Sequence, residues 1–562
     1  MSFEKIRLKR PRRSVFRQNN SVRTTLNIGE VIPSFWRIMV PGDTFHFGQV
    51  AQVELMPMVA PTKGDLYLES CAFFVAFDSL AIENEEKFTE ILSHVTDTQQ
   101  AVPIPKWDLE TSKTEQDGTL KSTEINTLWD KFGFPLNLKQ LDGSVTPIAY
   151  LQRAFNSIYN YYIRDENLDD ERDLNDNTIP TCCYKKDLFT SAFLSPQKGI
   201  APTLQLRGNA SALWSDEVIN TIVGILTTYN NMQSTTYQNG GSKVNNLSKG
   251  ELQFMPDNSI PNAINGVPLA TKGVSIEGTI SSGVTSKAGI KVNQDLLDLL
   301  NNNTLDLSSV ITFNIEELRT LNKLQKWLER LQIAGNRTKE FLLANYGVAP
   351  SNEAMDMPVF LGRLRTPVMI NSVTSSVETQ ISGQTIPQGT KSGQGYGTNA
   401  VRFKSWTSKE PGLILVVSYL RPKSAYSQGI NRQWIVDTVY DYYNPIFANL
   451  GNQEIKNAEL FASGTKAEDT GIFGFTERNQ ELRYVPDVVT GDLRANRSLQ
   501  SWSIGRHFTE LPTLDSDFIH VNPSEYDYLF AISHNEQPQA VVTFYNICQA
   551  IRPLPKFPQA TL

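Results

Sequence analysis

An acidic run, RDENLDDERDLNDN (residues 164–177), holds the densest set of side chains that could bind a metal ion. Its carboxylates could offer oxygen ligands to a hard cation such as calcium. They belong to Asp165, Glu166, Asp169, Asp170, Glu171, Asp173 and Asp176. The run lacks the ligand spacing and the turn-forming glycine of an EF-hand loop. We therefore expect a solvated loop after a helix, and we predict neither a metal site nor a cofactor.

The residues that could act as nucleophiles, general bases or soft metal ligands are scattered. The five histidines are His46, His94, His507, His520 and His534. They form no H-E-x-x-H motif and no group with cysteine, so each is expected to be structural. The chain also has no G-x-S-x-G nucleophile elbow and no G-x-x-x-x-G-K-S/T phosphate loop. The pattern predicts a protein without catalytic residues.

The cysteines do not form a recognisable site. They are Cys71, Cys182, Cys183 and Cys548. None has the C-x-x-C or Cys/His spacing of a zinc site, and the adjacent pair cannot easily bind one tetrahedral ion. We expect four reduced thiols in an intracellular protein.

A positively charged arm begins a chain that is otherwise acidic. Residues 1–23 hold one acid, Glu4, and eight cations: Lys5, Arg7, Lys9, Arg10, Arg12, Arg13, Arg17 and Arg23. The arm therefore carries +7, which leaves −14 for the rest of a chain whose formal net charge is −7. Concentrated positive charge binds polyanions, so these eight residues are the candidate nucleic-acid-binding site. A solvated, disordered tail without a partner is the alternative.

Neither a signal peptide nor a membrane span is predicted. The string MSFEKIRLKRPRRSVF has no continuous apolar stretch after its charges and no small-residue cleavage site. The longest apolar run, Leu413 to Leu420, is less than half of the roughly 18 residues that a membrane-spanning helix needs. We expect this run to be a buried strand, without membrane insertion.

Strands joined by long loops are the predicted framework. The chain is rich in Thr, Ser, Asn, Phe and Tyr and contains 34 Gly and 29 Pro, a composition that favours strands over a helical bundle. The predicted strands are Gln49–Val59, Leu66–Phe77, Thr366–Val373, Asn399–Trp406, Gly412–Leu420 and Gln539–Ile547. Helical spacing of apolar residues in 151–168 and 315–332 predicts two helices that pack against this β core.

No linker divides the chain, so we expect one large domain over residues 24–562, after the arm of residues 1–23. Two polar, Gly-rich stretches interrupt the predicted elements. The first lies within 207–303; it is longer than an ordinary loop and is expected to form an outward-facing insertion. The second, Ser382–Asn399, is expected to be a flexible connection or a binding loop.

A set of longer strings is informative because of its order along the chain. The strings are VPGDTF (40–45), LESCAFFVAFDSL (68–80), KFGFP (131–135), AYLQRAFNSIYNYYIRDENL (149–168), DLFTSAFLSPQKG (187–199), LNKLQKWLERLQIAGNRTKEFLLANYGVAP (321–350), YSQGINRQW (426–434), VYDYYNPIFANLGNQEI (439–455), FGFTERNQELRYVPDVVTGDLR (473–494) and AIRPLP (550–555). This ordered set resembles the major capsid proteins of microviruses, in particular those of the gokushovirus branch.

The resemblance implies a mainly β fold, an eight-stranded antiparallel viral jelly roll with large loop and helical insertions. It also implies that about 60 copies close a T=1 icosahedral shell around circular single-stranded DNA. The virion would be assembled in the cytoplasm of a host bacterium, and the protein would have no catalytic residues. The implied partners are further copies of the chain, the DNA genome, an internal scaffolding protein, a DNA pilot protein, a small basic DNA-binding protein and a host surface receptor. The insertion within 207–303 would form a surface protrusion that contacts the host.

In such a shell, we expect the arm to lie on the inner wall and to bind phosphates regardless of base sequence. Phe3 and Phe16 could add base stacking, whereas Phe35 and Trp36 are expected to pack into the shell. Two other functions stay open from the residues alone. A soluble β-rich protein that binds a receptor or a glycan would form a small oligomer without nucleic acid. An enzyme on a β scaffold would need a nucleophile with its base, or clustered carboxylates, and the sequence offers neither.

Overall fold

The computed structural model describes residues 12–82, 85–93, 103–107, 126–135, 147–203, 315–381, 384–436, 438–439 and 441–557, together with residue 220 and six two-residue strands between residues 238 and 286. The chain divides into two compact units. The main unit comprises Met1–Ala201 and Gln325–Leu562, and the insertion unit is Pro202–Leu324. Apart from the short strands, the predicted insertion within 207–303 lies outside the described residues.

The secondary structure of the main unit is mostly β. Its strands are β1 Ser14–Arg17, β2 Asn20–Leu26, β3 Val31–Met39, β4 Thr44–Leu55, β5 Leu66–Ala76, β12 Val359–Thr374, β13 Thr379–Ile381, β14 Gln384–Ile386, β15 Lys391–Arg402, β16 Trp406–Thr407, β17 Gly412–Pro422, β18 Ala425–Tyr426, β19 Gln453–Lys456, β20 Ile472–Thr476, β21 Asp487–Val488 and β22 Ala540–Arg552. Its helices are α1 Phe88–Ser93, α2 Leu128–Lys131, α3 Tyr150–Tyr162, α7 Thr338–Tyr346, α8 Asn457–Leu460, α9 Lys466–Asp469 and α10 Ser516–Ile519.

Helix α6, Ile315–Ala334, spans the division between the two units. The short strands of the insertion unit form three hairpins: β6 Gln238–Asn239 with β7 Ser242–Lys243, β8 Ala263–Ile264 with β9 Val267–Pro268, and β10 Gly278–Thr279 with β11 Thr285–Ser286. Within the described ranges, no helix combines the length and the apolar character that crossing a bilayer requires.

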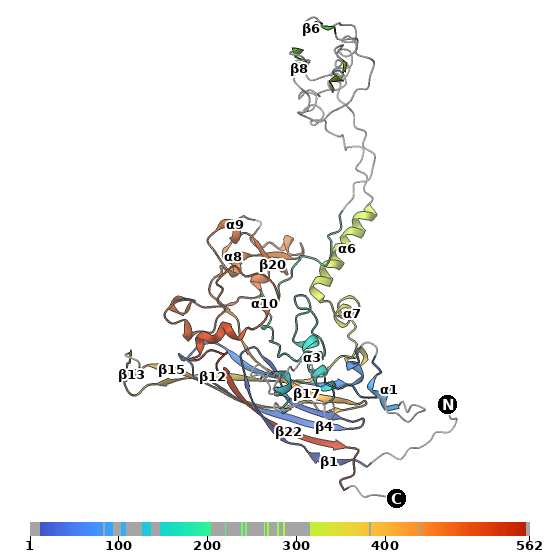
Figure 1. The fold of residues 1–562 in the computed structure, drawn as a ribbon, viewed down its shortest axis with the longest axis vertical. Helices are drawn as coiled ribbons and strands as arrows, with labels where there is room; N and C mark the ends of the chain where they lie inside the picture. The colour runs from blue at the N-terminus through green and yellow to red at the C-terminus, as the bar shows by residue number, and fades with distance from the viewer. Residues whose placement is uncertain are drawn as a thin grey trace, which may run out of the picture. The chain divides into compact units, whose positions relative to one another are not determined.

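A ten-stranded antiparallel sheet organises the main unit (Figure 1). Its strand order is β1-β22-β4-β15-β12-β5-β17-β3, with β2 also paired to β22 and β16 to β4. The long strand β12 joins two halves, because Val359–Val368 pairs with β5 and Met369–Thr374 pairs with β15. The sheet curls, so the two halves enclose a common core. This arrangement confirms a mainly β, jelly-roll-like fold with insertions.

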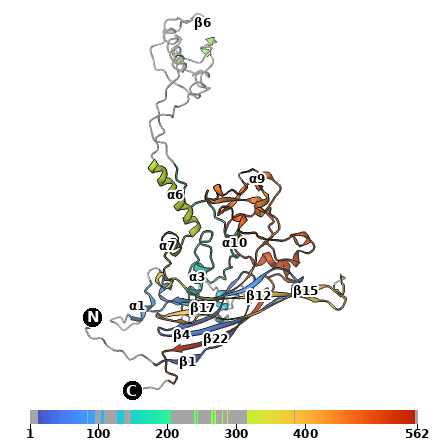
Figure 2. The same cartoon turned by 180° about the vertical axis from the view of Figure 1, so that it is seen from behind.

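Within the main unit, helices of the segments between strands lie on one side of the curled sheet. Figures 1 and 2 show α3 and α10 on this side, and β4, β22 and β1 on the opposite side of the main unit. Two core clusters hold these layers together. The larger cluster lies within the curled sheet and under α3, and the smaller one joins segment 183–192 to segments between residues 426 and 519.

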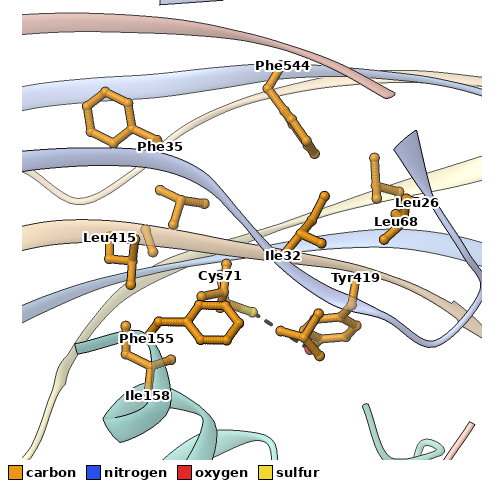
Figure 3. Close-up of a cluster of buried hydrophobic side chains, with 14 of the residues drawn as sticks. Leu26, Ile32, Phe35, Leu68, Cys71, Phe155, Ile158, Leu415, Tyr419 and Phe544 are labelled. Atoms are coloured by element: carbon orange, nitrogen blue, oxygen red, sulfur yellow. Dashed lines mark hydrogen bonds between the residues drawn. The ribbon is translucent and has the colours of Figure 1, made fainter. Parts of the chain in front are cut away.

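Figure 3 shows how the larger core is filled from both faces of the β5/β17 half of the sheet. Phe35 of β3 and Phe544 of β22 are buried between the two halves. On the other face, Phe155 and Ile158 of α3 lie beside Cys71 of β5. Both faces of this half are therefore buried, which is why its strands read as continuous apolar runs in the sequence.

The predicted elements are largely confirmed. Each of the six predicted strands overlaps a strand of the sheet, in the order β4, β5, β12, β15, β17 and β22. The two predicted helices correspond to α3 and α6. Helix α3 is buried along most of its length, whereas among the apolar residues of α6 only Leu331 is buried.

The predicted loop at Ser382–Asn399 is wrong over its second half, which belongs to β15 in the middle of the sheet. The glycines of this strand face inward, where there is no room for side chains. A Cβ atom on Gly395 would lie 2.4 Å from Leu55 Cδ1, and one on Gly397 would lie 2.6 Å from the carbonyl oxygen of Pro367. Glycine has low strand propensity, but here it permits this close packing, so composition concealed the strand.

A buried carboxylate ties three strands of the sheet together. Glu69 of β5 is 1% exposed and accepts from Arg421 of β17 at 2.6 Å. Arg363 of β12 forms a second ion pair with it, and Arg365 lies 3.6 Å away, stacked over Tyr67 at 3.5 Å from the ring centroid. Burial raises the pKa of Glu69, but Arg421 and Arg363 outweigh burial and hold its pKa below the ordinary glutamate value.

We expect Glu69→Gln to lower the free energy of unfolding by about 3 kcal/mol at neutral pH, because it leaves Arg421 partly buried without its counter-charge. A depressed folded-state pKa stabilises the fold above the unfolded pKa, and this contribution is lost as the pH falls through the folded pKa. The difference between wild type and variant should therefore shrink in acid. Urea unfolding of the soluble chain as a function of pH measures it.

Glu54→Gln is the matched control, since Glu54 is an exposed carboxylate on β4. Its expected effect is below about 0.5 kcal/mol. Equal effects of the two substitutions would contradict the role assigned to Glu69.

Candidate functional surfaces

The predicted nucleic-acid-binding residues fall into two groups. Lys5, Arg7, Lys9 and Arg10 lie outside the described residues. Arg12 and Arg13 are exposed and directly precede β1. Arg17 ends β1 and Arg23 lies within β2, and both are exposed. Part of the predicted arm is therefore a pair of strands that run along the C-terminal strand β22.

The strand register places Arg17 and Arg23 on one face of the sheet. In an antiparallel pair, residues directly opposite each other point to the same side. Arg17 lies opposite Gln549 of β22, which lies opposite His46 of β4. Arg23 lies opposite Thr543 in the same way. We call the side of the sheet that carries the outward side chains of β1, β2, β22, β4 and β15 the β22 face.

The β22 face is positively charged and partly aromatic. Arg402 of β15 is exposed on it, two strands away from Ile547. Tyr545 and Tyr396 are 43% and 41% exposed on the same face. Glu54, which accepts from Gln52 at 3.2 Å, is the single acid among its described outward residues. Exposed aromatic rings beside cations suit contacts with bases and phosphates.

The aromatic residues considered for base stacking lie in different environments. Phe35 is buried and stacked on Phe47, with ring centroids 5.8 Å apart. Trp36 is partly buried and makes an edge contact with Phe132. Both therefore pack into the fold, as predicted. Phe16 of β1 is partly buried, and Phe3 lies outside the described residues.

The acidic run is a loop after α3, as expected, and Asp170, Glu171 and Asp173 are exposed, but most of the rest of the run is only partly solvated. The amides of α3 bind its backbone. Asn156 Nδ2 donates to the carbonyl groups of Leu174 and Asp176, at 2.8 and 2.9 Å. Asn160 Nδ2 donates to the carbonyl of Arg172 at 2.8 Å. These amides are four residues apart on one side of the helix, so they hold the run against the helix surface.

Two carboxylates of this run are buried and paired. The side chains of Asp165 and Asp169 are each 8% exposed. Asp165 pairs with Lys186, and Asp169 lies 2.8 Å from His520 Nε2. Burial raises the pKa of Asp169, but hydrogen bonds from His520, Ser516 and the backbone of Asp165, together with the charge of His520, outweigh burial, so the pKa lies below the ordinary aspartate value. The sequence gives no sign of this pairing, because 351 positions separate Asp169 from His520.

A second surface, the apolar segment of residues 430–450, was not predicted from the sequence. The structure describes it except at residues 437 and 440. Its exposed large apolar or aromatic side chains are Ile430, Trp434, Val436, Val439, Tyr442, Tyr443, Ile446 and Leu450. Trp434 is 80%, Val439 88% and Ile446 81% exposed. Soluble monomers rarely expose so much apolar surface in one place, so the segment is a candidate contact with another protein.

Local hydrogen bonds shape this apolar segment. The side chain of Asn431 accepts from the backbone N–H of Gln433, and that of Asn444 accepts from the N–H of Ile446, both at 3.0 Å. These bonds begin two 3-10 turns, Arg432–Trp434 and Pro445–Phe447. Such caps satisfy backbone groups that would otherwise have no partner, so the chain presents its apolar side chains from an ordered backbone.

Comparison with known proteins identifies relatives along almost the whole chain. The family described as "Capsid protein (F protein)" matches residues 5–562. Capsid protein VP1 of Chlamydia phage 1 is 28% identical over 97% of this chain and 95% of the relative. Capsid protein VP1 of Bdellovibrio phage phiMH2K is 26% identical, over 98% and 96%. Capsid protein VP1 of Spiroplasma virus 4 is 25% identical, over 97% and 94%. The resemblance to microvirus capsid proteins is confirmed.

Proposed function

The chain belongs to the phage capsid protein (F protein) family, and from this premise we propose that it closes a T=1 icosahedral shell around circular single-stranded DNA, with its β22 face toward the genome. Family membership by itself makes the chain a structural component of a phage virion and not an enzyme. The further claims concern the symmetry of the shell, its contents and its contacts.

The observation that carries the proposal is the positive charge that begins the chain and continues onto the β22 face. Arg12 and Arg13 lead into β1, and Arg17 and Arg23 extend the charge along β22. The 13 residues before β1 would span about 40 Å if extended, at about 3.3 Å per residue. Contacts of cations with phosphates release counterions and do not depend on base sequence, which suits the packaging of a whole genome.

Association of the subunits needs large contact surfaces, and the apolar segment 430–450 supplies one. An exposed apolar segment has an unfavourable hydration free energy in a free subunit, and burial against another copy removes this cost. Trp and Tyr are also the residues most often found at the energetic centre of interfaces. We assign this segment to a contact between copies of the chain.

The remaining partners follow from the resemblance. An internal scaffolding protein, a DNA pilot protein and a small basic DNA-binding protein would act during assembly in the cytoplasm of a host bacterium. The insertion within 207–303, which lies mostly outside the described residues, would form the protrusion that contacts a host receptor. Long polar loops on a rigid scaffold commonly carry recognition, because they vary without disturbing the core.

A soluble receptor- or glycan-binding protein is the second candidate function. It predicts a small oligomer without DNA.

To test the proposal as a whole, a lysate that produces the chain is treated with nuclease and sedimented, and the pellet is examined by electron microscopy and DNA extraction. Uniform icosahedral particles with protected circular single-stranded DNA support the shell; a slowly sedimenting, DNA-free chain overturns it.

The first prediction concerns the arm. Full-length chain in which Arg12, Arg17 and Arg23 are replaced by Gln should bind oligo(dT) more weakly at low salt. The slope of log K against log salt should fall in magnitude by about 2, since each phosphate contact with a single strand contributes about 0.7. Fluorescence anisotropy of a labelled oligonucleotide at several salt concentrations measures this slope.

A variant with Lys466, Arg494 and Arg497 replaced by Gln is the control. These three side chains are exposed and do not lie on the β22 face. The same loss of slope in the control would show that binding depends on overall charge and not on the arm.

The second prediction concerns subunit association. Ile446→Ser should raise the protein concentration needed for particle formation by about 30-fold, which corresponds to about 2 kcal/mol at an interface centre. Ile200→Ser is the control, because Ile200 is also highly exposed, at 91% compared with 81%. Particle yield is measured by sedimentation over a concentration series. Equal effects of the two substitutions would refute the assignment of segment 430–450.

The third prediction concerns the insertion. Deletion of residues 228–250 should leave particle yield unchanged and reduce attachment to host cells, because a protrusion is not part of the shell wall. Attachment is measured as the fraction of particles that remains with washed cells. Loss of particles instead would show that the segment is needed for assembly.

A further inference from the structure

Three side chains with metal-binding atoms lie close together, although they come from three separate segments of the chain. Asp169 follows α3 in the acidic run, Cys183 lies in an extended segment, and His520 directly follows α10. An antiparallel bridge joins Cys183 to His520. One carboxylate oxygen, the thiol sulfur and an imidazole nitrogen all lie within 4.8 Å of one another. These three donors are outside the β22 face and outside segment 430–450.

The distances between the donor atoms suit a small tetrahedral ion. Asp169 Oδ2 lies 2.8 Å from His520 Nε2, and Cys183 Sγ lies 3.9 Å from the same nitrogen. In a tetrahedral zinc site, metal distances near 2.0 Å for N or O and 2.3 Å for S separate the donors by about 3.3–3.6 Å. These two separations lie on either side of this range, and the Asp169 oxygen and the Cys183 sulfur lie within 4.8 Å of each other, so small side-chain movements would bring the three donors around one ion.

The surrounding groups orient the imidazole ring for this role. His520 Nδ1 lies 3.1 Å from the backbone oxygen of Thr181 and 2.9 Å from its hydroxyl. Donation by Nδ1–H to this carbonyl leaves a lone pair on Nε2, the nitrogen that faces Asp169 and Cys183. A second hydrogen bond of this kind accompanies almost every histidine that binds a metal in proteins.

One oxygen of the Asp169 carboxylate could also accept a further bond. Asp169 Oδ1 is buried without a hydrogen bond of ordinary geometry, although the Ser516 hydroxyl is close enough to lower the pKa of Asp169. A buried carboxylate oxygen without a full partner is costly, and coordination of a cation by one or both oxygens would remove that cost.

We propose that Asp169, Cys183 and His520 bind a zinc ion that fastens the segment after α3 to Cys183 and α10. The donor set favours zinc over calcium, because thiolate and imidazole are soft or borderline ligands, whereas calcium takes oxygen ligands only. Water or the second oxygen of Asp169 would complete the tetrahedron. The ion would strengthen the connection between the two core clusters, since Phe518 and Ile519 of α10 belong to the smaller cluster and α3 to the larger.

A metal-free ion pair is the competing explanation. Burial lowers the pKa of His520, but its hydrogen bonds with Asp169 and Cys183 outweigh burial and raise its pKa to about 10. In that state a proton occupies the position on Nε2 that the metal would take.

The first measurement is the zinc content of purified full-length chain after dialysis against buffer without metal. Wild type should retain about one zinc per chain, and Cys183→Ala and His520→Gln should fall to background. Cys182→Ala is the control, because Cys182 is buried beside Cys183 but is not one of the three clustered donors. It should retain the wild-type zinc content.

The second measurement uses wild type alone, so it does not depend on whether the variants fold. Cobalt(II) added to the metal-free chain should give the intense near-ultraviolet charge-transfer band of a cobalt–thiolate bond, and added zinc should remove it. A chelator should lower the thermal midpoint of wild type by about 5 °C and leave that of a folded Cys183→Ala chain unchanged.

A folded wild-type chain with neither stoichiometric zinc nor the cobalt band would overturn the proposal in favour of the ion pair. Zinc retained by Cys183→Ala would also overturn it, by excluding the thiolate.

Discussion

The C-terminal strand β22 lies between β4 and the N-terminal strands β1 and β2, and its antiparallel pairing with them is the interaction on which the rest of the structure depends. Strand β22 pairs with β4 from Ala540 to Ile551 and with β1 and β2 along its other edge. This pairing joins segments about 500 residues apart, and closing so long a loop costs conformational entropy. Long, continuous hydrogen bonding and the burial of side chains such as Phe544 offset this cost. It also decides which side of each strand is buried, and therefore which side carries the arginines of the β22 face.

The long insertions are anchored by polar contacts as well as by apolar packing. Asn156 and Asn160 of α3 hold the acidic run by its backbone carbonyls, and Glu69 joins β5 to arginines of β12 and β17. Polar groups at such depth stabilise a fold only when they are fully paired, and they then favour one arrangement of the segments over others. The amides of Asn156 and Asn160 thus fix a segment without regular secondary structure against α3, and Glu69 fixes three strands within the sheet.

The two candidate surfaces have complementary physical properties. The β22 face offers cations and aromatic rings, which suit a flexible polyanion, and the segment 430–450 offers apolar side chains on an ordered backbone, which suit another folded surface. In the proposed shell, a subunit would use the first surface for a contact that ignores nucleotide sequence and the second for a contact that depends on shape. The fold places the two surfaces on different segments of the chain.

The sequence by itself determined the mainly β class, six strands of the sheet, helices α3 and α6, the positive arm and the likeness to microvirus capsid proteins. These features depend on local periodicity, composition and ordered strings, which are readable along one chain. Tertiary structure alone decided that Arg17 and Arg23 lie on strands beside β22, that the glycines of β15 form a central strand, and that Trp434 and Ile446 are exposed. It also decided that Asp169, Cys183 and His520 meet. Each of these depends on which distant segments pair, and the free energy of that pairing is shared over the whole core, so no local pattern records it.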